Sequence, residues 1–219
     1  MRIPSLLFVT VACALPVAVG CAAGKGRAVS FEDAAVGVLP AGWRTDATNP
    51  KGPPATWAVV GETRDGSATK SLALTKIEDT SRGVFNLCIA PVEDFGDGAV
   101  SVRLKALTGA IDQGGGVCWR LKDARNYYIA RYNPLEKNYR VYVVKDGTRT
   151  MLAEAKDITL AAGQWFTLKI EQRGDAIKAY LDGALKVETK DATFAAPGAV
   201  ALWSKADAAT AFDDLEIGP

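Results

Sequence analysis

Histidine is absent from all 219 residues of the chain. Its absence excludes Ser-His-Asp and Cys-His catalysis and removes the commonest zinc ligand. The chain also has no large excess of either charge, with 26 basic and 25 acidic residues. A net charge of +1 argues against a nucleic-acid or anionic-membrane partner, which would need a basic face. Any hydrolysis would have to rely on carboxylates, tyrosine, lysine or arginine.

A long apolar run lies at the N-terminus, from Leu6 to Val19. It follows Arg2 and precedes small residues, which is typical of a secretory signal peptide, and it is too short to span a membrane. We therefore expect a signal peptide over residues 1–23, a short tether over 24–28 and one domain over 29–219.

Two interpretations of the signal cleavage site stay open. Residues 18–21 resemble a bacterial lipobox, in which Cys21 would be lipidated and would give the only membrane contact. The alternative is ordinary cleavage among the small residues 20–24. Both predict export, to the periplasm, the outer membrane or cell surface, or the medium.

Cysteine is scarce in the expected domain, where only Cys88 and Cys118 remain of the four in the chain. Outside the cytoplasm the two thiols are permitted to form a disulfide. Two separate buried thiols that pack as small apolar residues are the alternative.

Helical periodicity over three turns is missing after residue 28, and alternation of apolar and polar residues takes its place. Residues 99–106, 166–171 and 177–182 each alternate in this way, which predicts strands with one buried face. Asp146-Gly147 and Asp182-Gly183 supply the positive φ angles of two-residue hairpins. Roughly a dozen to fourteen strands result, too many for one open sheet. The chain is predicted to be all-β, a two-sheet antiparallel β-sandwich of the jelly-roll kind.

The densest group of polar and aromatic residues runs from Asp112 to Arg140. Three successive antiparallel strands are expected there, at 116–121, 126–133 and 138–145. Alternation directs Val117, Trp119 and Leu121 to the core and Arg120 to the opposite face. The same rule gives one shared face to Arg131 and Asn133, and one to Asn138 and Arg140.

If Arg120, Arg131 and Arg140 share an outer sheet face, they form an array of forked donors that suits sugar hydroxyls or carboxylates. The alternative is a ladder of cross-strand ion pairs that solvates an exposed face. The tryptophans at 43, 57, 165 and 203 are expected to be packing residues. The glycines 114–116 mark either a close approach to a ligand or a bulge or tight crossing that a side chain would block.

Several segments of the chain have a characteristic composition, namely residues 112–120, 126–131, 133–136, 179–183 and 211–217, with Trp165 opening a strand. Together they resemble bacterial secreted proteins of the concanavalin A-like lectin/glucanase superfamily. The resemblance is closest to the 3-keto-disaccharide hydrolase-like domain group and more distant to laminin-G modules, and it covers residues 29–217.

The resemblance implies a two-sheet jelly roll whose concave face is the usual carbohydrate site. The Glu-x-Asp-x-x-Glu signature of the glucan hydrolases in that superfamily is absent from this chain. The superfamily allows a calcium ion, with Asp213 or Asp214 as candidate ligands, although turn capping beside the last strand is the favoured interpretation of both aspartates. No other cofactor is expected.

From these observations we expect an exported, non-catalytic binding module of the cell envelope that recognises a carbohydrate or similar polar ligand. The expected contacts on the concave sheet are Arg120, Arg131, Asn133, Asn138 and Arg140, with Gln113 from the adjacent loop. One alternative is a glycoside-cleaving enzyme of the 3-keto-disaccharide hydrolase type, with a carboxylate or tyrosine as base. Another is a structural or adhesion module that binds another protein.

Overall fold

The computed structural model describes residues 26–219. The predicted signal peptide, Cys21 and the start of the tether lie outside the described residues. Residues 26–219 contain fifteen strands and no helix, and so no helix that could cross a membrane. The expected all-β class is therefore confirmed.

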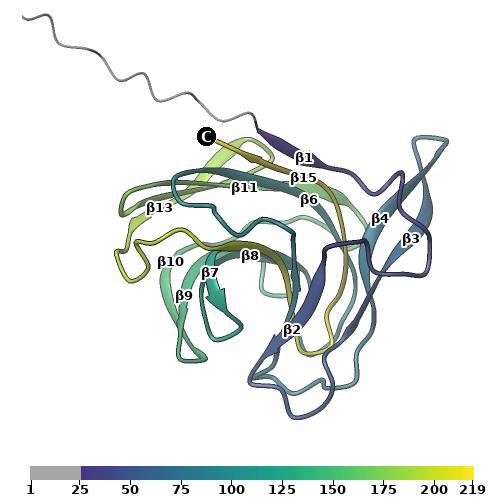
Figure 1. The fold of residues 1–219 in the computed structure, drawn as a ribbon, viewed down its shortest axis with the longest axis horizontal. Helices are drawn as coiled ribbons and strands as arrows, with labels where there is room; N and C mark the ends of the chain where they lie inside the picture. Colours follow the sequence, from purple (N-terminus) through teal and green to yellow (C-terminus); the bar gives the residue numbers. More distant parts are fainter. Residues whose placement is uncertain (1–25) are drawn as a thin grey trace, which may run out of the picture.

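Two antiparallel sheets account for the strands (Figure 1). In spatial order, sheet A contains β13 (Ala184–Lys190), β12 (Ala176–Leu181), β11 (Trp165–Arg173), β6 (Gly98–Thr108), β15 (Ala209–Gly218), β4 (Ser67–Lys76) and β3 (Thr56–Arg64). A short strand, β1 (Arg27–Val29), pairs with β15, so the sheet includes residues 27 and 28 of the expected tether. In spatial order, sheet B contains β10 (Thr148–Ala155), β9 (Asn138–Lys145), β8 (Asn126–Asn133), β7 (Gly115–Asp123), β14 (Ala199–Lys205), β5 (Phe85–Ile89) and β2 (Arg44–Thr48).

The main core lies between the two sheets. Strand β6 shows how the sequence builds it, because Val100, Val102 and Leu104 are fully buried while Ser101 and Arg103 on the other face are partly exposed. This is the alternation that predicted the strand. From sheet B, side chains such as Trp119, Tyr128 and Leu202 pack against this core.

Sheet B buries its second face as well, in a separate cluster that includes Ile129, Tyr142 and Trp203. We call this the concave face of sheet B. Its burial follows from a strong curl of the sheet (Figure 1). The edge strands β2 and β10 are six strand spacings apart, about 29 Å in a flat sheet. Nevertheless Asn49, directly after β2, donates to the Gly147 carbonyl in the β9–β10 turn at 2.8 Å.

Further hydrogen bonds at the end of β2 stabilise the curl. Thr48 donates to the Ala124 carbonyl in the β7–β8 turn, and Arg125 of that turn donates to the Asn49 side chain at 2.8 Å. Gly147 has a φ of 77°, which favours glycine, and a Cβ there would also crowd the ends of the Asn49 and Arg125 side chains. We refer to the contacts of residues 48–49 with these two turns as the latch.

The two cysteines of the domain lie on opposite faces of sheet B and are free. Cys88 packs in the core between the sheets, whereas Cys118 packs on the concave face. Of the two alternatives open at the sequence level, the structure has separate buried thiols.

Candidate functional site

Four of the six predicted site residues lie together on the concave face of sheet B. In the register of β8 and β9, Arg131 is opposite Arg140 and Asn133 is opposite Asn138. Directly opposed residues of antiparallel strands point to the same side, so the predicted face of these four residues is confirmed. Strand β10 adds Glu154 opposite Arg140.

The two arginines share their partners. Arg131 Nη2 donates to Glu136 Oε2 at 2.7 Å and to the Tyr142 hydroxyl at 3.1 Å. Arg140 Nη1 donates to the same atoms at 3.0 and 3.3 Å, and its Nε donates to Glu154. An ion-pair ladder is thus part of this face, as the alternative interpretation expected.

Exposure separates these residues into a floor and a rim. Arg131, Asn133 and Asn138 are almost completely buried, whereas the Arg140 side chain keeps 25% of its surface exposed. Arg131 therefore holds Glu136 and Tyr142 in place from beneath, and Arg140 presents the network to solvent.

Both glutamates of the network are held in the charged form. Burial acts against the charge of Glu136, but its bonds to Arg131 and Asn138 outweigh burial and lower the pKa. For Glu154, burial is likewise outweighed by Arg140 and Lys156, and the pKa is lowered. These carboxylates can accept hydrogen bonds, but neither is suited to donate a proton near neutral pH.

The side chain of Asn133 forms hydrogen bonds with loop residues at one end of the concave face. Its Nδ2 donates to Asp112 at 2.9 Å, and its Oδ1 accepts the backbone amides of Leu135 and Glu136. Asp112 also pairs with Lys205. Gln113, the next residue in this loop, is partly exposed.

The expectation that Arg120 shares this face is wrong. Arg120 has a φ of 46° at an irregularity in the β7–β8 register, and this left-handed residue interrupts the alternation of β7. Its guanidinium donates instead to the carbonyls of Phe194 at 2.7 Å and of Gly96 and Gly174 at 3.2 Å. A fourth bond joins it to Asp97 at 2.8 Å.

The same irregularity redirects Leu121. We expected Leu121 in the core beside Val117 and Trp119, which do lie there. Leu121 instead packs in the cluster of the concave face. Alternation is reliable only where a strand has no left-handed residue.

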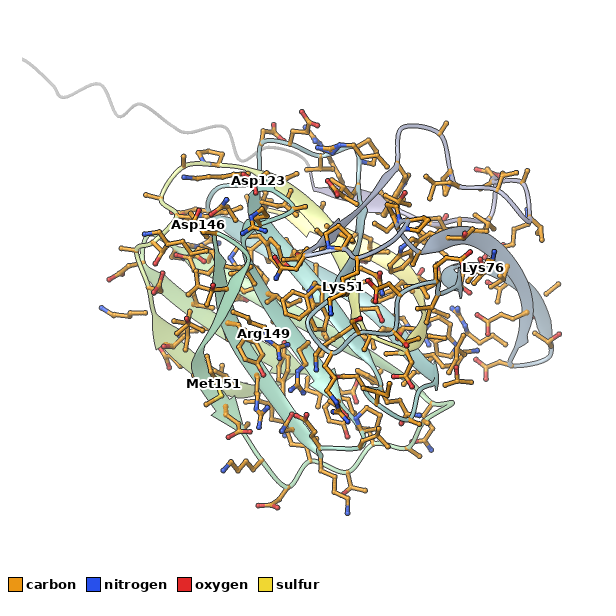
Figure 2. The ribbon with its side chains drawn as sticks, turned by 90° about the horizontal axis from the view of Figure 1, so that it is seen from below. Lys51, Lys76, Asp123, Asp146, Arg149 and Met151 are labelled. Carbon is orange, nitrogen blue, oxygen red and sulfur yellow. The ribbon has the colours of Figure 1, made fainter. Side chains whose placement is uncertain are left out.

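A further residue of the concave face, Arg149 on β10, was not foreseen from the sequence. Its guanidinium lies over three rings from different strands, with the guanidinium carbon 4.3 Å from the ring centre of Tyr142, 4.9 Å from Phe85 and 5.8 Å from Trp203. Strand β5 is five spacings from β10, about 24 Å in a flat sheet, so only the curl permits this contact. Figure 2 labels Arg149 and its strand neighbour Met151.

The electrostatics of Arg149 are unusual for an arginine. Burial lowers its pKa, and the positive charge of Arg131 adds to this effect. Among residues 26–219 its Nη1 has no hydrogen-bond partner. The three rings supply cation–π contacts in place of a carboxylate.

The glycines 114–116 form a tight crossing, one of the two interpretations of this motif. A Cβ at Gly114 would overlap the Tyr132 carbonyl, and one at Gly116 would overlap the Ala130 carbonyl. Gly114 also has a φ of 86°. These glycines admit neighbouring backbone, so nothing at this point indicates a ligand.

The candidate calcium ligands contact arginines. Asp213 accepts from Arg64 at 2.7 Å, and Asp214 pairs with Arg103 at 3.4 Å. Within residues 26–219 no group of three or more acidic or cysteine side chains is arranged to hold a metal ion.

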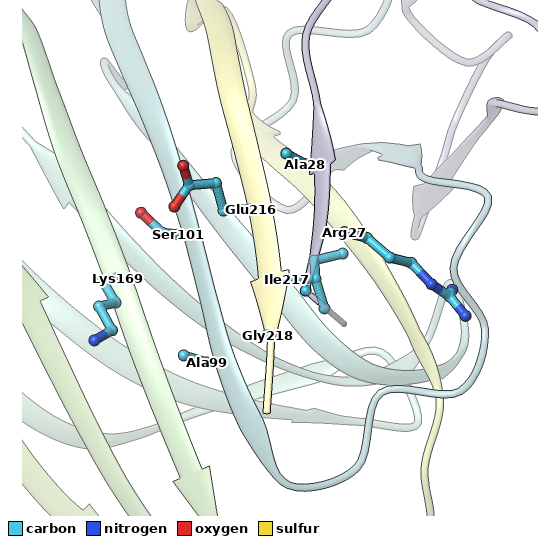
Figure 3. Close-up of a pocket in the computed structure, with 9 residues that line it drawn as sticks. Arg27, Ala28, Ala99, Ser101, Lys169, Glu216, Ile217 and Gly218 are labelled. Carbon is cyan, nitrogen blue, oxygen red and sulfur yellow. The ribbon is translucent and has the colours of Figure 1, made fainter. Parts of the chain in front are cut away.

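A hollow of about 430 Å³ lies on the outer face of sheet A, where β1, β15, β6 and β11 meet (Figure 3). Its lining includes Ser101, Lys169 and Glu216, and Lys169 is paired with Glu171 at 2.6 Å. No residue predicted to bind a ligand lines this hollow.

No protein-family model matches the chain, and no curated protein matches it. Similar solved structures do exist. The carbohydrate-binding module CBM66 from Bacillus subtilis is 23% identical, with a TM-score of 0.62 over 80% of this chain and 95% of that one. Domain 4 of AbnA, a GH43 extracellular arabinanase from Geobacillus stearothermophilus solved with arabinotriose, is 17% identical, with a TM-score of 0.57 over 87% of this chain and 90% of the other.

The β-glucanase of Bacillus licheniformis is 14% identical, with a TM-score of 0.57 over 90% of this chain and 99% of that one. At these identities the likeness concerns the fold. The sheet order, the curled sheet and these similarities agree on one architecture. The chain has the two-sheet jelly-roll fold that is found in carbohydrate-binding modules and glycoside hydrolases and is consistent with a concanavalin A-like fold.

Proposed function

We propose that this protein is an exported, non-catalytic carbohydrate-binding module and that its ligand binds on the concave face of sheet B. The observation that carries the proposal is the network of Arg131, Arg140, Glu136 and Glu154 around the Tyr142 hydroxyl. It combines forked donors, charged acceptors and an aromatic ring on one curved face.

The chemistry of this network suits a polyhydroxylated ligand. A sugar hydroxyl both donates and accepts, so it can bond to a guanidinium and a carboxylate at once. Arg140 and Glu154 offer that pair from adjacent strands, and Arg140 is the partly exposed member. Gln113 would reach the ligand from the neighbouring loop, while the buried Arg131, Asn133 and Asn138 support the face.

Two further observations support the proposal. The similar structures include a carbohydrate-binding module and an arabinanase domain solved with arabinotriose. Export rests on the signal-like sequence of residues 1–23.

Absence of two-carboxylate glycoside hydrolysis is proposed from the state of these carboxylates. Glycoside hydrolysis by two carboxyl groups requires one of them to be a proton donor with a raised pKa. Glu136 and Glu154 both have lowered pKa values. Neither therefore meets the requirement for a general acid.

The proposal is tested by screening the protein on a glycan array and measuring the best oligosaccharide by isothermal titration calorimetry. We expect Arg140→Ala to weaken binding by about tenfold or more, because a hydrogen-bonding contact at a ligand site is lost. Arg103→Ala is the matched control, since Arg103 is also partly exposed and ion-paired but lies on sheet A. Binding that is equal in Arg140→Ala and wild type, or no binding to any glycan, would refute the proposal.

A separate assay addresses catalysis. The protein is incubated with 3-keto-glycosides, and the products are followed by chromatography. We expect no turnover. Turnover that stops in Glu136→Gln would refute the non-catalytic part and favour the enzyme alternative.

A further inference from the structure

We infer that the ligand is an acidic saccharide and that Arg149 binds its anionic group. This inference rests on the proposed carbohydrate-binding function and names the class of sugar. It follows from a difference between Arg149 and the other cations of the concave face.

The other cations of this face each contact a carboxylate. Arg131 pairs with Glu136, Arg140 with Glu154 and Lys205 with Asp112. Arg149 forms no ion pair and donates no hydrogen bond within the described residues, and its Nη1 is buried without an acceptor. The face therefore contains one positive charge whose counterion the described chain does not supply.

The rings of Phe85, Tyr142 and Trp203 hold this guanidinium over the concave face. They stabilise its charge but accept no in-plane hydrogen bonds from it. Because Nη1 is buried, the donors available to a ligand are Nε and Nη2, which lie side by side on one edge of the guanidinium. Carboxylate and sulfate groups have the geometry that a guanidinium binds through two parallel hydrogen bonds.

Strand β10 suggests how the rest of such a ligand would lie. Arg149, Met151 and Glu154 share its concave side, since they are opposite Val144, Tyr142 and Arg140 of β9. Arg149 and Glu154 are separated by roughly 15 Å of strand, which is longer than one sugar ring. Met151 lies between them and is 50% exposed.

The two ends of the concave side of β10, at Arg149 and at Glu154, differ in charge. At one end Arg149 is a cation without a carboxylate partner, whereas at the other end Glu136 and Glu154 accept hydroxyl groups and their charges are balanced by Arg131 and Arg140. A ligand that carries its acidic group on one unit and neutral units beside it matches this pattern better than a uniform polyanion does.

The test is an array on which each acidic oligosaccharide is paired with its neutral counterpart. Uronic-acid oligosaccharides are paired with their carboxyl-reduced forms and sulfated ones with their desulfated forms, so the array shows which anionic group is bound. Titration calorimetry of the best pair follows. We expect the acidic member to bind about tenfold or more tightly than the neutral one. Equal binding of the two members would overturn the inference without the need for any variant.

Two variants assign the preference to this residue. Arg149→Gln keeps most of the side chain but removes the charge, so it should abolish the difference between the pair. Arg103→Gln on sheet A is the matched control and should keep it. A preference that survives in folded Arg149→Gln, checked by circular dichroism, would overturn the inference.

The two proposals fail in different ways. If both members of a pair bind alike and Arg140→Ala weakens both, the protein binds sugars but Arg149 does not select acidic ones. If no saccharide binds, acidic or neutral, the proposed function fails and the inference fails with it.

Discussion

Arg120 is predicted to hold the domain together and to have no part in ligand binding. Its side chain is 3% exposed and bonds to Phe194, Gly96 and Gly174 carbonyls and to Asp97. It thus joins the loop before β6, the β11–β12 turn and the loop before β14. The perturbation that tests this role is Arg120→Ala.

The magnitude follows from the burial of the group and its partners. A hydrogen bond to a charged group contributes about 1.5–3 kcal/mol, but four such terms do not add, because Asp97 is half-exposed and water can replace it. Removal of Arg120 leaves the carbonyls of Phe194, Gly96 and Gly174 without this donor, and each unsatisfied buried acceptor costs about 1–3 kcal/mol. We therefore expect Arg120→Ala to lower the free energy of unfolding by about 3–5 kcal/mol, a large part of the usual 5–15 kcal/mol.

Backbone conformation separates the side-chain effect from strain. Arg120 has a φ of 46°, which glycine adopts more easily than alanine. Arg120→Gly should therefore be less destabilising than Arg120→Ala by about 1 kcal/mol.

Urea unfolding followed by tryptophan fluorescence measures both variants, provided that the denaturant slope is unchanged. Arg103→Ala, with its exposed ion pair, is the control and should cost about 0–1 kcal/mol. If the free energy of unfolding of Arg120→Ala is within about 1 kcal/mol of wild type, the structural role of Arg120 is refuted. A variant that folds but loses glycan binding would refute the claim that Arg120 lies outside the site.

Two predictions concern titratable groups. Burial raises the pKa of the thiols of Cys88 and Cys118, so neither should react with iodoacetamide at pH 8 until urea unfolds the chain. Peptide mass spectrometry measures the labelling. Either residue labelled in the native state, or the two linked by a disulfide, would contradict the structure. The pKa values of Glu136 and Glu154 are lowered from 4.5 in the folded chain, so the unfolded chain binds more protons and stability should fall as the pH drops below about 4.5. Unfolding midpoints between pH 6 and pH 3 measure this loss of stability, and the midpoint should fall less steeply with pH in Glu136→Gln. A midpoint that falls equally in the variant would show that Glu136 does not contribute to the pH dependence.

Much of the fold could be predicted because local signals decided it. The expected strands at 126–133 and 138–145 match β8 and β9 residue for residue, since alternation and turn chemistry both operate over short distances. The shared face of Arg131 and Arg140 followed from the same alternation. The predicted face of Arg120 was wrong because its left-handed conformation occurs where β7 passes the backbone of Gly198, a contact distant in sequence.

Arg149 shows the boundary between local and global information. The Asp146-Gly147 hairpin fixes the register that places Arg149 opposite Val144, and hence on the face of Tyr142. That much was available from the sequence. Its approach to Phe85 and Trp203 depends on the curvature of the whole sheet, which no local pattern encodes.

The latch between Asn49 and Gly147 also bears on affinity. It sets the spacing of the two sheet edges through contacts within the chain, so under the proposed function the concave face has its shape before a ligand binds. A ligand would then lose less of its binding free energy to ordering the protein. If the proposed function holds, substitutions in the latch, far from the side chains proposed to contact the sugar, would therefore weaken binding by loosening the concave face.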